Sequence, residues 1–135
     1  MSLLIKLRVV IDTNVFISGL NWGGNPKLIL DLWLDSKFVL LMSPYLAWEI
    51  VSTCQKFDQP AEDIEKLRVY LATKTLKVVP PKRTAICRDA KDNQILDLCS
   101  FGAADFLVTG DKDLLALRKF AETKIVRPKE FLLAV

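Results

Sequence analysis

The sequence contains no histidine among its 135 residues, and this absence excludes most of the familiar catalytic arrangements. Without an imidazole there is no Ser-His-Asp triad, no Cys-His nucleophile pair and no H-E-x-x-H zinc site. There is also no histidine to act as a general base. Any catalysis by this chain must therefore use carboxylates, lysine, hydroxyl groups or a metal ion.

Cysteine and long apolar runs are scarce as well. Cys54, Cys87 and Cys99 form no C-x-x-C pair, so we expect reduced, buried thiols and neither a disulfide framework nor a zinc site. Apolar runs such as residues 38–42 (FVLLM) are far too short to cross a bilayer. The first ten residues lack the apolar segment and cleavage site of a secretory leader. These features predict a cytoplasmic protein with no membrane partner.

What the chain has is the composition of an ordinary globular domain. Hydrophobic residues make up 51% and charged residues 26%, and 19 basic residues oppose 16 acidic ones for a net charge of +3. A chain of this length can bury one substantial core. We therefore expect a single domain over residues 1–135.

Short apolar segments typical of buried strands alternate with segments typical of amphipathic helices. Asn25-Pro26 resembles an N-cap followed by the first helical residue, and Ser43-Pro44 and Asp89 also resemble helix starts. This alternation predicts an α/β fold with a parallel sheet between layers of helices. We expect strands at 7–11, 38–42, 76–79, 106–108 and 125–126, and helices at 26–36, 44–56, from 60 onwards, 89–100, 113–119 and at the C-terminus.

Acidic residues fall where strands of this predicted sheet end. Asp12 directly follows the first strand, and Asp111 and Asp113 follow a later one. Glu49 and Asp92 lie near the starts of helices that could reach the same edge. In an open parallel sheet, ligands bind beyond the carboxyl ends of the strands. The sequence therefore predicts a group of carboxylates where a ligand would bind.

Each acid also has a purely structural explanation, which the sequence leaves open. Asp92 and Asp113 suit helix N-termini, where negative charge opposes the helix dipole. Asp111 suits a turn or an N-cap, and Glu49 could be solvent-exposed on its helix. Asp12 is the hardest to explain in this way, because a carboxylate at the end of a buried strand is costly without compensation.

Taken together, the acids favour a metal-assisted reaction at phosphorus. Carboxylates at one sheet edge repel one another unless a cation screens them. Mg²⁺ and Mn²⁺ prefer oxygen ligands, and such ions can bind phosphate and stabilise a leaving oxygen. Two other schemes fit less well. A haloacid-dehalogenase-type phosphatase needs D-x-D where this chain has Asp12-Thr13-Asn14, and a response-regulator receiver needs an acceptor aspartate after a central strand, where this chain reads LLMSP.

Four segments together resemble PIN-domain proteins: VIDTNVFISGL, AWEI, RDAKDNQILDLCSFGAADFLVTGDKDLLAL and IVRPKEFL. The likeness runs from Val9 to Leu132 and is strongest to small prokaryotic PIN proteins described as toxins of toxin–antitoxin systems. The DTNV segment alone is moderately specific, whereas the ordered set is highly specific. One departure is RDAKDN, where this branch often has RDPDDN, so that Lys91 replaces an acid beside Asp92.

The resemblance implies a three-layer α/β/α sandwich with a central five-stranded parallel sheet. It implies Mg²⁺- or Mn²⁺-dependent cleavage of RNA that leaves a 5′-phosphate and a 3′-hydroxyl, by a homodimer that binds a cognate antitoxin. Asp113 would be an accessory metal-binding acid, and Asn14 and Thr109 would be supporting polar residues near the metal. By the same resemblance, the acidic quartet that binds metal and performs catalysis is Asp12, Glu49, Asp92 and Asp111.

The remaining charge suits an anionic substrate. Without the five candidate acids, 11 acidic residues oppose 19 basic ones, an excess of eight positive charges. An acidic pocket within a basic surround suits a polyanion. Trp22, in the loop NWGGN, could stack on an unpaired base, although packing within the protein is the simpler explanation. Candidate RNA contacts are Lys82, Arg83, Arg88, Lys91 and Lys112.

The sequence therefore predicts a metal-dependent endoribonuclease that is the toxin of a type II toxin–antitoxin pair. A housekeeping RNA-processing enzyme and a structure-specific DNA nuclease of the same fold are alternatives, as is a non-catalytic nucleic-acid-binding module. The intact quartet argues against the last of these. The assignment as a toxin rests on the resemblance alone.

Overall fold

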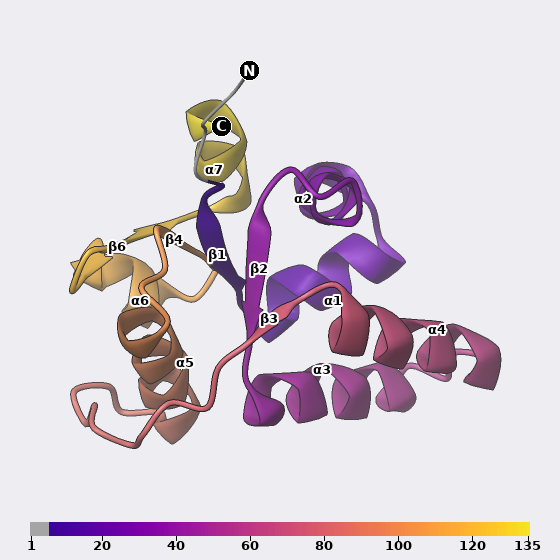
Figure 1. Ribbon diagram of the computed structural model, residues 1–135, viewed down its shortest axis with the longest axis horizontal. Coiled ribbons are helices and arrows are strands. Elements are labelled where there is room, and N and C mark those ends of the chain that lie inside the picture. The colour runs from indigo at the N-terminus through magenta and orange to yellow at the C-terminus, as the bar shows by residue number, and fades with distance from the viewer. Residues whose placement is uncertain (1–5) are drawn as a thin grey trace.

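The computed structural model describes residues 6–135, which form one sheet flanked by helices (Figure 1). The strand order is β3-β2-β1-β4-β6-β5, and every neighbouring pair is parallel except β5 and β6. The strands are β1 (Arg8–Ile11), β2 (Val39–Met42), β3 (Leu76–Lys77), β4 (Phe106–Val108), β5 (Lys119–Phe120) and β6 (Thr123–Val126). The predicted five-stranded parallel sheet is confirmed, and the short antiparallel strand β5 was not predicted.

Seven helices, within residues 6–135, cover both faces of the sheet. The helices α5 and α6 lie on one side, and α1 to α4 with α7 lie on the other (Figure 1). The predicted three-layer α/β/α arrangement is therefore confirmed. The helices are α1 (Thr13–Asn21), α2 (Gly24–Leu34), α3 (Pro44–Lys56), α4 (Ala61–Thr73), α5 (Ala90–Phe101), α6 (Lys112–Leu117) and α7 (Pro128–Ala134).

Two details at the start of the chain differ from the sequence-based expectation. Residues 13–21 form the helix α1, which was not predicted. The prediction of Asn25 as an N-cap was wrong, because α2 already begins at Gly24. Gly23 and Gly24 have φ angles of 79° and 69°, and this left-handed backbone, which glycine adopts readily, turns the chain into α2 before Asn25 is reached.

The core holds the central strands rigidly in place. Val9, Val10 and Ile11 of β1 are completely buried, as expected for a central strand covered on both faces. Phe131 of α7 is also fully buried and makes edge-to-face contacts with Phe38 and Phe106, so the C-terminal helix is anchored against the sheet. The residues of β1 and β4 that precede the candidate site are therefore packed within the hydrophobic core.

The expected state of the cysteines agrees with the structure. Cys54 and Cys99 are buried, Cys87 is half-buried, and all three are free thiols. No helix formed by residues 6–135 is long and apolar enough to span a membrane.

Candidate metal centre

At the centre of the sheet, between β1 and β4, the order in which successive strands are added reverses direction. From β1 the chain moves outward to β2 and β3, then returns to β4 on the other side of β1. The two strands β1 and β4 pair in parallel, with Ile11 opposite Val108, and the Asp12 N–H donates to the Val108 carbonyl over 3.0 Å. Such a reversal opens a crevice at the carboxyl ends of the strands, where α/β proteins bind ligands.

Asp12 directly follows β1 at this reversal, and only 8% of it is exposed. It occupies the N-cap position of α1, but its side chain makes no capping hydrogen bond. Its carboxylate instead accepts a hydrogen bond from the Thr109 hydroxyl over 2.7 Å. Burial raises the pKa of Asp12, nearby Asp111 and Glu49 raise it further, and the hydrogen bond from Thr109 opposes this rise.

Thr109 links the ends of the two strands. Its side chain is completely buried, and its hydroxyl donates to Asp12 while accepting the Asp111 N–H over 3.0 Å. A single hydroxyl therefore positions one candidate acid through its side chain and another through its backbone. The expectation that Thr109 lies near the acids agrees with this geometry.

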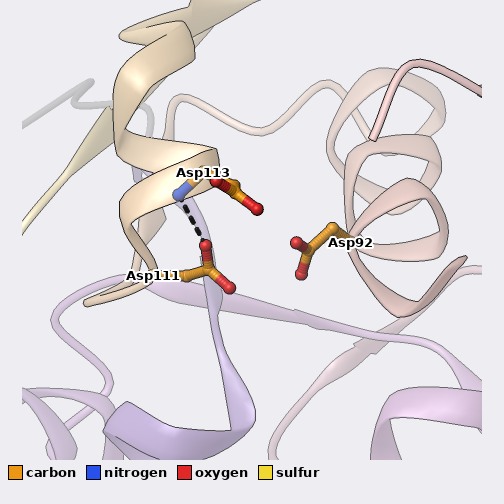
Figure 2. A group of neighbouring side chains, drawn as sticks. All are labelled: Asp92, Asp111 and Asp113. Carbon is orange, nitrogen blue, oxygen red and sulfur yellow. Dashed lines mark hydrogen bonds between the residues drawn. The ribbon is translucent and has the colours of Figure 1, made fainter. Parts of the chain in front are cut away.

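Three carboxylates converge beside this link (Figure 2). Asp92 comes from the first turn of α5, and Asp111 and Asp113 come from the start of α6. Each offers an oxygen, and these oxygens lie within 4.8 Å of one another. Asp111 is also the N-cap of α6, where its carboxylate accepts N–H groups from Asp113 over 2.7 Å and Leu114 over 3.3 Å. The capping explanation for Asp111 is therefore correct and coexists with its place in the cluster.

The cluster is electrostatically costly in the absence of a cation. Asp92 is 6% exposed, and burial raises its pKa from 3.8 to about 6, with further contributions from Asp111, Asp89 and Asp12. Asp113 is compensated by Arg88, whose guanidinium donates to both of its oxygens at 3.2 and 3.0 Å. This ion pair is exposed to solvent and contributes little to stability. The uncompensated charge is thus concentrated on Asp92 and Asp12.

Glu49 lies beside the cluster, on α3, and is held by residues that the sequence analysis did not select. Its Oε1 accepts a hydrogen bond from the Thr13 hydroxyl, and its Oε2 accepts one from the Tyr45 hydroxyl over 3.0 Å. Lys91 lies 3.8 Å from the same Oε2. With 14% of its side chain exposed, Glu49 is not the solvent-exposed residue that the alternative explanation required. Thr13 and Tyr45 could have been found as the residue after Asp12 and the position one helical turn before Glu49.

The other predicted site residues are more dispersed. Asn14 is exposed at the start of α1, and its side chain makes none of the hydrogen bonds found within residues 6–135. Arg88 contacts Asp113 of the cluster and Lys91 lies near Glu49, whereas Lys82, Arg83 and Lys112 are exposed and form none of the ion pairs found within residues 6–135. Trp22 is 68% exposed and makes an edge-to-face contact with Phe57. It therefore packs against the protein on one side and leaves much of its ring open to solvent.

Comparison with known proteins agrees with this geometry. A model of the PIN domain (PIN_3) matches residues 8–113. The chain belongs to the PIN-domain family. It is 35% identical to the uncharacterized protein MJ1680 of Methanocaldococcus jannaschii over 142 aligned residues, which cover 95% of this chain and 91% of that protein. It also resembles VapBC2 from Rickettsia felis, solved bound to a DNA fragment from their promoter, with a TM-score of 0.61 over 88% of this chain and 97% of the other. At 13% identity, that likeness shows the fold alone.

The acids of this PIN domain are a suitable donor set for a hard divalent cation. All the candidate ligands are carboxylate oxygens, which Mg²⁺ and Mn²⁺ prefer over nitrogen or sulfur. The oxygens of Asp92, Asp111 and Asp113 are close enough together for one ion. The pKa of Asp92 is raised first by burial and then by neighbouring carboxylates, whose negative charge a cation would neutralise. The group is therefore consistent with a metal site.

Asp92→Asn should stabilise the metal-free protein at pH 7.5. The folded-state pKa of Asp92 is raised, so its contribution to stability is complete below about pH 4 and is lost as the pH rises through about 6. At pH 7.5 the buried charge should cost on the order of 1–3 kcal/mol, which corresponds to a melting temperature roughly 5 °C higher in the variant. Thermal unfolding in EDTA at pH 4, 6 and 7.5 measures this difference.

The difference should shrink towards pH 4, where the wild-type carboxyl is neutral, and added Mg²⁺ should raise the melting temperature of the wild type more than that of the variant. Asp35→Asn, at an exposed acid outside the cluster, is the control and should leave both responses unchanged. Equal melting temperatures of wild type and Asp92→Asn in EDTA at pH 7.5 would contradict the interpretation.

Proposed function

We propose that this PIN domain is a Mg²⁺- or Mn²⁺-dependent endoribonuclease. The observation that supports the proposal most directly is the convergence of three carboxylates at the switch point of the sheet, within 4.8 Å of one another. A chain without histidine needs another means of activating water and neutralising phosphate charge, and a carboxylate-bound cation provides both.

In this proposal Asp92, Asp111 and Asp113 hold the cation, and Asp12 and Glu49 complete its surroundings. When bound, the cation supplies positive charge at the phosphate and favours ionisation of the attacking water. Thr109 keeps Asp12 oriented, because its hydroxyl donates to that carboxylate. Arg88 positions Asp113 from the solvent side.

Glu49 would orient the water that attacks phosphorus and accept its proton. The hydroxyls of Thr13 and Tyr45 donate to different oxygens of Glu49 and so limit the rotation of its carboxylate. Burial and the bond to Glu49 raise the pKa of Tyr45 to about 12, so its hydroxyl stays protonated and remains a donor at neutral pH. The family resemblance implies that the 3′ oxygen is the leaving group and takes up a proton, so that hydrolysis would give a 5′-phosphate and a 3′-hydroxyl.

Asp12→Asn should abolish cleavage of RNA and leave the fold intact, because the amide has the shape of the carboxylate but not its charge. The measurement is cleavage of a mixed pool of RNA with Mg²⁺ or Mn²⁺, with the new ends mapped by sequencing. Wild-type protein should cut only when one of these metals is present.

A contaminating nuclease would be revealed by Asp12→Asn cleaving as fast as the wild type after identical purification, and this result would refute the assignment. Cleavage of single-stranded or structured DNA with no cleavage of RNA would replace the ribonuclease by a DNA nuclease of the same fold. Binding of RNA without cleavage under any metal condition would indicate a non-catalytic module.

Thr13→Val should lower kcat by roughly ten- to a hundredfold, because Glu49 loses the donor that fixes one of its oxygens. Thr13→Ser is the matched control, since it retains the hydroxyl, and it should keep most of the activity. A similar loss in Thr13→Ser, which retains the hydroxyl, would mean that the hydrogen bond to Glu49 does not account for the effect of Thr13→Val. The KM for RNA should change little, because Thr13 is buried and does not contact solvent.

We also propose that the protein is the toxin of a type II toxin–antitoxin pair, acts as a homodimer and is inhibited by a cognate antitoxin. The support is the sequence likeness to the toxin branch and the fold shared with VapBC2, which is a toxin–antitoxin complex. A small reading frame beside the gene would be the candidate antitoxin.

Expression of the wild-type chain in a bacterial host should arrest growth, and Asp12→Asn should not. The reason is that uncontrolled cleavage of cellular RNA stops translation, whereas the variant lacks the charge needed for cleavage. Growth curves after induction measure the effect, with matched protein levels as the control. Unimpaired growth with active wild-type protein would favour a housekeeping RNA-processing role.

A further inference from the structure

A polar groove of about 690 Å³ lies between α6, β6 and α7. Figure 1 shows these three elements around the end of the sheet where β6 lies. Lys112 lines the groove and lies in the sequence between Asp111 and Asp113. The groove therefore begins one residue from two acids of the centre.

The groove is basic. Lys112 of α6, Arg118 just after α6 and Arg127 just before α7 all line it, and Glu130 is its acidic residue. The Glu130 carboxylate accepts the backbone N–H of Arg127 over 3.0 Å, so it is engaged in starting α7. Among the ion pairs formed within residues 6–135, none includes Lys112, Arg118 or Arg127. Three cations, from the two ends of α6 and the start of α7, thus line one groove without an ion-pair partner among residues 6–135.

Arg118 adopts a backbone conformation that residues with a side chain rarely accept. Its φ is 61° and its ψ is −40°, and this conformation is held by hydrogen bonds from the Arg118 N–H to Leu115 and from the Ile125 N–H to Arg118. Glycine would adopt a positive φ at no steric cost. Four other residues with side chains, Ser36, Asp58, Ala103 and Ala121, also have positive φ angles, so the part of Arg118 in the groove follows from its place in the lining and not from its backbone.

Two other cations near the candidate metal centre, Arg88 and Lys91, already lie beside acidic side chains. Arg88 forms an ion pair with Asp113, and Lys91 lies 3.8 Å from Glu49. These residues neutralise acids of the site and have less charge to offer a phosphate. Lys112, which lies between Asp111 and Asp113 in the sequence, belongs instead to the groove and is in none of the ion pairs formed within residues 6–135.

We propose that this groove binds the backbone phosphates of the single-stranded nucleic acid whose neighbouring phosphodiester lies at the acidic cluster. The location of the reacting phosphate rests on the proposed function, but the binding of the strand does not require cleavage. Lys112 contacts the phosphate nearest the centre, and Arg118 and Arg127 contact phosphates further along the strand. A groove lined by cations at the two ends of α6 and at the start of α7 suits a chain of phosphates better than one small anion.

The test measures binding separately from cleavage. A fluorescein-labelled single-stranded RNA of twelve nucleotides and mixed sequence is titrated with the protein in EDTA, and anisotropy is recorded between 50 and 200 mM KCl. Each phosphate contact on single-stranded nucleic acid contributes about 0.7 to the dependence of log Kd on log salt. Arg127→Gln and Arg118→Gly should each lower that slope by about 0.7 and weaken binding about tenfold at 50 mM KCl.

Two controls separate a groove from general surface charge. Lys124→Gln on β6 and Lys129→Gln on α7 remove exposed cations from the same elements but not from the groove, and they should leave the Kd within about twofold. Arg118→Gly should also melt at the same temperature as the wild type or higher, because glycine relieves the strained φ. Weakening by the controls as large as that by the groove variants would overturn the proposal.

Further binding measurements, with DNA and with inorganic phosphate, identify the kind of ligand that the groove holds. Single-stranded DNA of the same sequence should bind with a similar salt slope, because the groove contacts phosphates and not bases. Potassium phosphate at matched ionic strength should not displace the RNA, and full displacement would mean a site for a single anion. Absence of salt-dependent RNA binding by the wild type would also overturn the proposal.

The binding results stand apart from the proposed function. If the protein cleaves RNA, Arg127→Gln should raise KM and leave kcat unchanged. If it does not cleave RNA, the binding results still decide whether the groove holds a strand.

Discussion

The parallel pairing of β1 with β4 is the constraint on which the rest of this site depends. The pair ends with Ile11 opposite Val108, so the next residues, Asp12 and Thr109, emerge side by side at the switch point. Thr109 then joins the two strand ends, because its hydroxyl donates to Asp12 and accepts the N–H of Asp111. Asp111 in turn caps α6 and brings Asp113 close to Asp92 (Figure 2). One register of one strand pair therefore brings Asp12 to Thr109, 97 residues further along the chain, and through Thr109 to Asp111.

The same arrangement opposes stability. Burial raises the pKa of Asp12 and of Asp92, which means that ionising these carboxyl groups costs more free energy in the folded protein than in water. The apolar base of the site, with β1 fully buried and Phe131 anchored between two other aromatic rings, supplies the packing that tolerates this repulsion. Outside the cluster, cations are divided between two tasks. Arg88 and Lys91 contact acids, whereas Lys112, Arg118 and Arg127 leave the groove beside them positive.

Much of the fold could be predicted because its signals are local. The five parallel strands are short apolar segments, and Ser43 and Asp89 cap helices as the sequence suggests. The helix α1 was missed because its apolar residues continue directly from β1, with Asp12 as an N-cap that makes no capping hydrogen bond. The strand β5 has two residues and exists only through its pairing with β6, so no periodicity could indicate it. Thr13 and Tyr45 were missed because ordinary hydroxyl residues become informative only when their partner, Glu49, is known.

The sequence by itself determined the chemistry that is available: acids without histidine, strands followed by aspartates, and an excess of positive charge. It also determined the family, since the ordered motifs are specific as a set. Only the tertiary structure decided which of these side chains lie together and which remain apart. It brings Asp113 together with Asp92 and Asp111, leaves Asn14 exposed, and pairs Arg88 with an acid while Arg118 and Arg127 line a groove. The physical reason is that distances between side chains depend on strand register and helix packing, and these are set by contacts between residues far apart in the chain.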